Sequence, residues 1–142
     1  MKKLINNYNF ERIDYITNQF LLNNFTKLNN ISNLIEHKHF NNKYPENNNI
    51  KGYFKYNECF VYENNKWNII SKNILMNDLI FKNCNFLLNF YINNKDIIID
   101  DNNKQYFDIY YNILLNFNNK TYNNNYFKFY IDKMITKNSF NL

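Results

Sequence analysis

Residues 50–91 read IKGYFKYNECFVYENNKWNIISKNILMNDLIFKNCNFLLNFY, and this stretch decides the fold. Apolar and polar residues alternate over 50–56, and two further β-rich runs follow at 59–62 and 67–70. The tetrapeptide Glu63-Asn64-Asn65-Lys66 between the last two runs is typical of a tight turn, because asparagine tolerates positive φ. We therefore expect three antiparallel strands paired in sequence order.

The second half of the stretch has the three- and four-residue periodicity of a helix over 74–91, which Asn73 can cap. A small sheet is stable only when one face is covered, and this helix is the nearest apolar surface. The sequence therefore predicts an α+β fold in which a three-stranded antiparallel sheet, at about 49–70, packs on the 74–91 helix. The apolar stripe of that helix consists of Met76, Leu79, Ile80, Cys84, Leu87, Leu88 and Tyr91.

Helical periodicity also appears on both sides of this unit. It predicts N-terminal helices at 10–22 and 30–38, and C-terminal helices at 104–117 and 126–137. The run at 97–99 is too short to classify. The 142 residues suffice for one domain, so we expect a single domain over 1–142. In the helix at 10–22 the expected stripe is Phe10, Ile13, Thr17, Phe20 and Leu21.

The composition indicates an AT-rich genome rather than a particular chemistry. The chain has 36 asparagines and no alanine, and asparagine, lysine, isoleucine, phenylalanine and tyrosine all have A/T-rich codons. Aromatic residues make up 20% of the chain, so it can bury a core despite being asparagine-rich. The net charge of +5 comes from scattered lysines and the single Arg12, which favours a solvated surface over a nucleic-acid face.

Two other features of the sequence indicate the cellular compartment of the protein. Cys59 and Cys84 cannot form a disulfide framework, so we expect reduced, buried thiols in an intracellular protein. Asparagine or a charged residue interrupts every hydrophobic stretch. We therefore expect neither a signal peptide nor a transmembrane helix, and no contact with a membrane.

One polar stretch is more specific than its composition: His39-Phe40-Asn41-x-x-x-Pro45-Glu46-Asn47-x-Asn49-Ile50. It resembles the motif HFN-x-x-x-PEN-x-NI of uncharacterised proteins from giant DNA viruses of the mimivirus type. The segment Val61-Tyr62-Glu63-x-x-Lys66-Trp67 is similar to the vYdgkW hairpin of the same family. Asn9 departs from a glycine that the family has nearby. The resemblance covers a core at about 5–92, followed by a C-terminal helical extension at about 93–142, and it implies no established activity.

The motif has one structural and two chemical interpretations. Asparagine, histidine and glutamate can pair buried polar groups in an irregular loop, and we favour this architectural role, with Trp67 packed over the loop or the 74–91 helix. A one-metal nuclease using His37, His39, Asn41 and Glu46 is a remote alternative. A zinc site from His37, His39, Cys59 and Cys84 has suitable ligand types without the usual spacing.

The sequence thus favours a non-enzymatic viral accessory or regulatory module that needs no cofactor or metal. We expect it to bind a viral or host protein in the host cell cytoplasm, in a viral factory or in the virion. Nucleic-acid binding, by DNA- or RNA-stacking aromatics such as Tyr53 with Lys55 or those at 122–130, is the alternative. The candidate binding residues are His39, Asn41, Pro45, Glu46, Asn47, Asn49 and Trp67.

Overall fold

The computed structural model describes residues 4–52, 57–99, 104–118 and 125–139. It confirms the predicted α+β fold: a three-stranded antiparallel sheet is combined with helices before and after it. In chain order the elements are α1 (Asn18–Phe25), α2 (Asn30–His39), the 3-10 turn η1 (Pro45–Asn47), β1 (Ile50–Gly52), β2 (Glu58–Glu63), β3 (Lys66–Ser71), α3 (Lys72–Asn93), α4 (Lys95–Ile99), α5 (Lys104–Asn118) and α6 (Asn125–Ser139).

The sheet has the order β1-β2-β3, and its register fixes which side chains share a face. Cys59 and Val61 of β2 are buried, whereas Phe60 and Tyr62 between them are half-buried and point to the opposite face. The first strand, β1, is described from Ile50 to Gly52, and the rest of the predicted strand, residues 53–56, lies outside the described part of the chain.

The tight turn between β2 and β3 is confirmed. Glu63 pairs with Lys66, and the two residues between them, Asn64 and Asn65, have φ values of 53° and 61°. Two central residues with positive φ define a type I′ turn, whose twist matches that of the strands it joins. Two asparagines therefore achieve what glycine does in most such turns.

This turn gives a first prediction. Asn64→Val is expected to lower the free energy of unfolding by about 1 kcal/mol, because a β-branched residue is strained at positive φ. Asn64→Gly is the matched control and is expected to leave stability unchanged or to raise it slightly. Urea denaturation of the three proteins measures both effects. Equal stability of the valine and glycine variants would contradict the positive φ at this position.

The long helix α3 begins two residues before the prediction, with Ser71 and not Asn73 as its N-cap residue. Because β3 ends where α3 begins, the helix folds back directly behind the sheet. Cys59 and Cys84 are buried free thiols, and burial raises the pKa of Cys84 to about 12. The buried side of α3 consists of Leu75, Met76, Leu79, Ile80, Asn83, Cys84, Leu87, Leu88 and Phe90.

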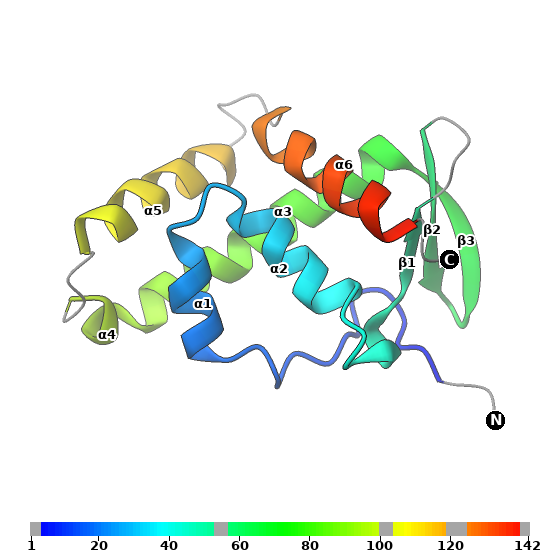
Figure 1. The fold of residues 1–142 in the computed structure, drawn as a ribbon, viewed down its shortest axis with the longest axis horizontal. Coiled ribbons are helices and arrows are strands. Elements are labelled where there is room, and N and C mark those ends of the chain that lie inside the picture. The colour runs from blue at the N-terminus through cyan, green and yellow to red at the C-terminus, as the bar shows by residue number, and fades with distance from the viewer. Residues whose placement is uncertain (1–3, 53–56, 100–103, 119–124, 140–142) are drawn as a thin grey trace.

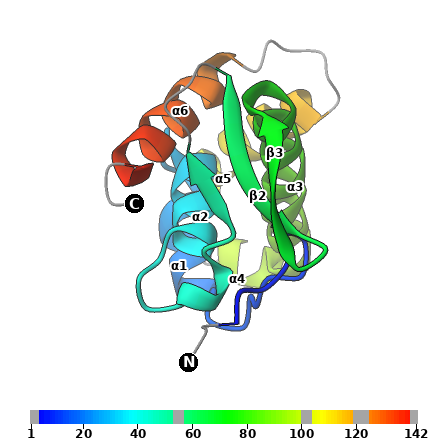
Figure 2. The same cartoon turned by 90° about the vertical axis from the view of Figure 1, so that its right-hand side faces the viewer.

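The sheet lies at one end of the molecule, and the helices extend away from it (Figure 1). Viewed from that end, the strands lie in front of the helices, so that the sheet has an inner face toward α3 and an outer face turned away (Figure 2). α6 contacts β1 at one margin of the sheet. The buried hydrophobic cluster includes Leu34 and Leu79 from the first part of the chain and Leu114 and Ile131 from the C-terminal helices.

The predicted helix at 10–22 is wrong in its first half. α1 begins at Asn18, and Thr17 is its N-cap residue, whose hydroxyl oxygen accepts a hydrogen bond from the Phe20 amide at 3.1 Å. Residues 4–17 instead form an irregular segment, which we call the N-terminal arm. Phe10 is 77% exposed, so its apolar spacing did not reflect a buried stripe.

The arm turns sharply at Asn9. Asn9 has φ of 77°, a backbone conformation that glycine adopts without strain and asparagine tolerates. The turn at Asn9 directs the arm past the sheet and along α3, where Tyr8 donates a hydrogen bond to Asp78 at 2.6 Å and the Lys82 ammonium contacts the Asn9 side chain.

Within the described residues, none of the helices combines the length and apolarity that a bilayer-crossing segment requires. The unclassified run at 97–99 belongs to the short helix α4. The expected C-terminal helices are present as α5 and α6, and the segment 119–124 between them lies outside the described residues.

Candidate functional site

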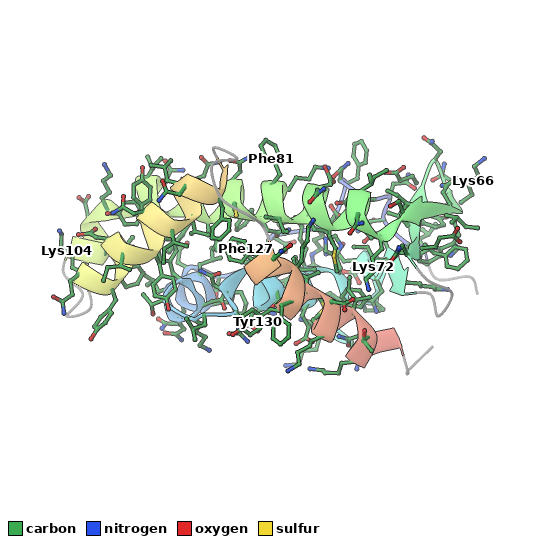
Figure 3. All side chains as sticks on the ribbon, turned by 90° about the horizontal axis from the view of Figure 1, so that it is seen from above. Lys66, Lys72, Phe81, Lys104, Phe127 and Tyr130 are labelled. Carbon is green, nitrogen blue, oxygen red and sulfur yellow. The ribbon has the colours of Figure 1, made fainter. Side chains whose placement is uncertain are left out.

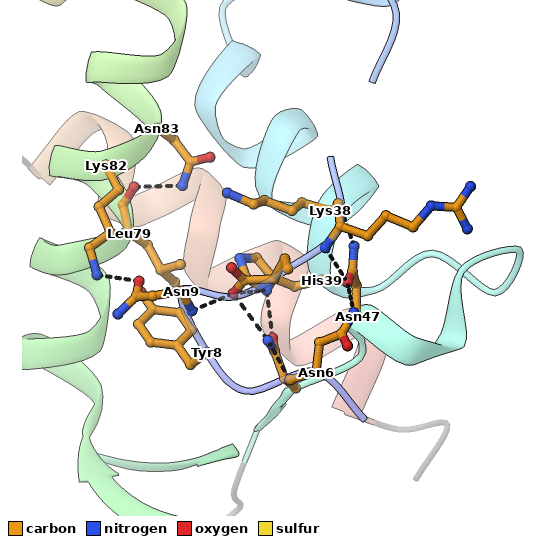
Figure 4. Close-up of polar contacts among 12 residues, drawn as sticks. Asn6, Tyr8, Asn9, Lys38, His39, Asn47, Leu79, Lys82 and Asn83 are labelled. Atoms are coloured by element: carbon orange, nitrogen blue, oxygen red, sulfur yellow. Dashed lines mark hydrogen bonds and ion pairs between the residues drawn. The ribbon is translucent and has the colours of Figure 1, made fainter. Parts of the chain in front are cut away.

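The motif residue Asn47 ties the N-terminal arm to the turn that precedes the sheet. Its side chain is fully buried. Its Oδ1 accepts hydrogen bonds from the Asn6 side chain and the Arg12 amide, both at 3.0 Å. Its Nδ2 donates to the Arg12 carbonyl at 2.6 Å and to the Tyr15 hydroxyl at 2.9 Å. One amide therefore pairs with two backbone groups and two side chains that are more than 30 residues away in sequence. Figure 4 shows Asn47 beside Asn6 in this network.

Asn49 forms the second half of the same buried network. Its Nδ2 donates to the Asn6 carbonyl at 3.2 Å and to Oε1 of Glu11 at 3.0 Å, which leaves Oδ1 to accept from Nδ1 of His39 at 2.7 Å. These donors fix the orientation of the amide, so His39 carries a proton on Nδ1. The Glu11 carboxylate also accepts from the Asn9 amide at 3.0 Å. We call Glu11, His39, Asn47 and Asn49 the arm network.

Burial sets the charge of this network. His39 is 1% exposed, and burial lowers its pKa to about 4, so the imidazole is neutral at pH 7. The Glu11 side chain is 4% exposed, and burial by itself would raise its pKa. The interaction with His39 and the hydrogen bonds it accepts outweigh that effect and lower the pKa of Glu11, which is therefore ionised.

Two motif residues lie at the surface end of the same region. Pro45 is the first residue of η1, where its fixed φ suits the turn. Glu46 was expected to pair a buried polar group of the loop, but its carboxylate pairs instead with the Arg12 guanidinium at 3.2 Å. That side-chain pair is solvent-accessible, and Arg12 also pairs with Asp14. The backbone carbonyl of Glu46 accepts from the Asn6 amide at 2.7 Å and so also holds the arm.

Asn41 lies on the other side of α2, next to His37. The Lys43 amide donates to Oδ1 of Asn41 at 3.0 Å, so Nδ2 faces Nδ1 of His37, at 3.4 Å. His37 therefore carries its proton on Nε2, and this atom is buried with no hydrogen-bond partner in the described residues. The His37 ring stacks on Phe20 with centroids 4.0 Å apart, and burial lowers its pKa.

His37 and Asn41 line a polar cavity of about 680 Å³ between α1, α2 and the C-terminal end of α6. Glu36 in this cavity pairs with Lys137 at 3.1 Å, and the rim also carries Lys27 and Lys43. All three helices turn their C-terminal parts toward the cavity, and cationic side chains stabilise the partial negative charge at helix C-termini. Lys137 is already paired with Glu36, and the helix C-termini make the cavity unfavourable for an anion, so it is not an evident anion site.

Trp67 lies apart from the other motif residues, on the outer face of the sheet. It was expected to pack over the 40–49 loop or the long helix, but its ring packs edge-on against Tyr62 with centroids 5.3 Å apart. The Lys51 ammonium lies 4.3 Å from the Trp67 ring centroid. Ile69, one pleat further along β3, is 62% exposed. We call Lys51, Phe60, Tyr62, Trp67 and Ile69 the outer-face cluster.

The structure thus divides the sequence motif into three regions. His39, Asn47 and Asn49 are buried in the arm network, Asn41 lies at the polar cavity, and Trp67 belongs to the outer-face cluster. Their role in binding stays a prediction. Sequence reasoning missed Glu11, although it is one of few acidic residues in the arm, because its partner lies 28 residues downstream and no local pattern links the two.

Three further findings bear on function. Among the described residues, no group of three or more histidine, cysteine, aspartate and glutamate side chains lies close enough together to hold a metal ion. The stacking candidates Tyr53 and Lys55 lie outside the described residues, as do residues 122–124 of the candidate stretch 122–130, whose remainder belongs to α6. Comparison of the chain with protein-family models, with curated proteins and with solved structures found no match.

Proposed function

We propose that this protein is a non-enzymatic module that binds a protein partner through the outer-face cluster. The observation that carries the proposal is the row of Phe60, Tyr62, Trp67 and Ile69 on the sheet face that none of the described helices covers. An antiparallel sheet with a free face normally presents polar side chains there. Here three aromatic rings and an isoleucine occupy it, which is the composition of the centre of a protein interface.

The Trp67 side chain is also held in place in the unbound protein. Trp67 is wedged between Tyr62 and Lys51, so little side-chain freedom is lost when a partner covers it. Tryptophan and tyrosine in such positions account for a large share of binding free energy in protein complexes. By contrast, the arm network is buried and internally paired, which supports an architectural role for His39, Asn47 and Asn49.

The setting of the proposed function follows from the sequence motif. Its resemblance to proteins of giant DNA viruses supports a viral protein that acts in the host cell cytoplasm, in a viral factory or in the virion. A viral or a host protein are both suitable partners. Nucleic acid is the alternative partner, because the chain carries a net charge of +5.

The test compares the wild type with Trp67→Ala and Phe81→Ala. Phe81 is 48% exposed on α3, away from the end of the sheet where Lys66 lies, and so is a matched aromatic control (Figure 3). Each immobilised protein is incubated with extract of infected cells, and retained proteins are quantified by mass spectrometry. We expect one protein to be retained by the wild type and Phe81→Ala, and at least tenfold less by Trp67→Ala.

Retention of the wild type and of both variants on heparin and on single-stranded DNA is measured in a parallel experiment. The proposal predicts weak retention that is the same for all three proteins. Retention on DNA that falls steeply with salt and is insensitive to Trp67 would support nucleic-acid binding instead. Capture of the same proteins by the wild type and by Trp67→Ala would refute the outer-face cluster as the binding surface.

A further inference from the structure

The two edge strands of the sheet differ in what lies beside them. β1 is one edge strand, and α6 contacts it. β3 is the other edge strand, and among the described residues its six residues pair on one side only, with β2. A strand at a sheet margin carries a row of backbone N–H and C=O groups that another strand can bind. The open edge of β3 is therefore the place where a strand of another chain could extend the sheet.

The turn geometry shows which backbone groups face that margin. In a two-residue hairpin the residues that flank the turn form a hydrogen-bonded pair, and pairs of this kind alternate along the strands. Glu63 and Lys66 are therefore bonded to each other, whereas Tyr62 and Trp67 are not. Two bonds confirm the alternation, because Tyr62 donates to the Asn49 carbonyl at 2.9 Å and accepts from the Tyr8 amide at 2.7 Å, both on the side away from β3.

It follows that the N–H and C=O groups of Trp67 and Ile69 point outward from the sheet, while those of Asn68 between them point to β2. No hydrogen bond within the described residues uses the outward groups of Trp67 or Ile69. The side chains of the same two residues belong to the outer-face cluster. β3 thus presents its free backbone groups together with an aromatic and a β-branched side chain.

We propose that β3 pairs with β3 of a second copy of this chain, antiparallel about a two-fold axis, to give a continuous six-stranded sheet. The inference rests on the proposed function, since it identifies a protein partner for β3, the edge strand that carries Trp67 and Ile69 of the outer-face cluster. A two-fold axis perpendicular to the sheet keeps both outer faces on one side. With Asn68 opposite its own copy, Trp67 of each chain lies opposite Ile69 of the other.

This register suits β3 in three respects. Aromatic and β-branched residues are favourable cross-strand neighbours, and the symmetry forms the Trp67–Ile69 pair twice. The outward groups of Trp67 and Ile69 on the two strands face each other, so donors meet acceptors on both sides of the axis. Lys66 falls opposite Ile70, and no position from 66 to 70 meets a like charge.

The experiment combines sedimentation with amide hydrogen exchange on the full chain. Sedimentation velocity across a wide concentration range is expected to show a species of twice the 17.6 kDa monomer mass. Exchange at the Trp67 and Ile69 amides is expected to slow at least tenfold as the dimer forms. Exchange at the Asn68 amide, which β2 already protects, is expected to stay unchanged.

Ile69→Lys and Ile74→Lys provide the variants. Both isoleucines are 62% exposed, but Ile74 lies on α3 and has no place in the proposed pairing. The first variant is expected to weaken self-association at least tenfold and the second to leave it unchanged. A wild type that is monomeric throughout, a dimer without new protection at Trp67 and Ile69, or equal association of the two variants overturns the inference. Monomers that still capture another protein through Trp67 overturn this pairing and leave the proposed function intact.

Discussion

Replacing Asn47 by alanine is expected to lower the free energy of unfolding by about 3 kcal/mol, which corresponds to a loss of roughly 10 °C in Tm. The substitution removes an amide that is 0% exposed and makes four hydrogen bonds. A lost bond costs more when its former partner stays buried, since that partner has no water to replace the amide. The bonds to the two backbone groups of Arg12 are partly buried, so water replaces the amide there only in part.

The adjacent residue provides the control. Asn48 has the same side chain, but its Oδ1 is buried without a hydrogen-bond partner in the described residues. Asn48→Ala removes an unsatisfied polar atom and is expected to change stability by less than about 0.5 kcal/mol. Glu46→Ala removes only a solvent-accessible ion pair with Arg12 and is expected to cost less than about 1 kcal/mol. Thermal and urea unfolding of the three variants measure these effects.

We therefore expect Asn47→Ala to have a much lower free energy of unfolding than Asn48→Ala and Glu46→Ala. Similar losses for Asn47→Ala and Asn48→Ala would mean that the arm is not fastened through Asn47. The same variants also separate architecture from binding. If Asn47→Ala is destabilised yet still retains the partner below its Tm, the arm network supports the fold and the binding surface lies elsewhere.

The parts of the fold that the sequence predicts are those held by local interactions. The hairpin around Asn64 and Asn65 is fixed by backbone preferences within four residues, and α3 by a stripe within one helix. The N-terminal arm is the opposite case. Phe10 and Ile13 have helical spacing, but the backbone at Arg12 bonds to Asn47, 35 residues away, and this contact outweighs the local preference.

The candidate site was likewise predictable only in part. The rare residues His39 and Pro45 marked the loop that carries the buried polar network, and buried polar pairing was the expected role. The sequence does not reveal which asparagine is buried, because 36 of them dilute the signal. Trp67 was expected to cover the loop. The turn predicted at 63–66 already implies that Trp67 lies opposite Tyr62. The structure adds that the two rings lie on the outer face, which alternates away from the buried Val61.

The second large effect is expected from acid. Burial lowers the pKa of His39 to about 4, while an unfolded chain has a histidine pKa of about 6.5. Between these values the unfolded state binds a proton that the folded state excludes, so stability falls as the pH falls through this window. Lowering the pH from about 7.5 to about 5 should reduce the free energy of unfolding by about 2 kcal/mol. Glu11, whose pKa is lowered, adds to the loss only in more acidic solution.

His39→Asn tests this mechanism, because an asparagine amide can replace Nδ1–H as the donor to Asn49 and does not titrate in this range. The variant is expected to lose most of the dependence of stability on pH, even if it is less stable at pH 7.5. His37→Asn, which removes the less buried histidine, is expected to retain it. Urea denaturation at a series of pH values gives the slope for each protein. A slope that survives His39→Asn but disappears in His37→Asn would assign the titration to the wall of the polar cavity, and His39 would then already be protonated in the folded state, paired with the carboxylate of Glu11.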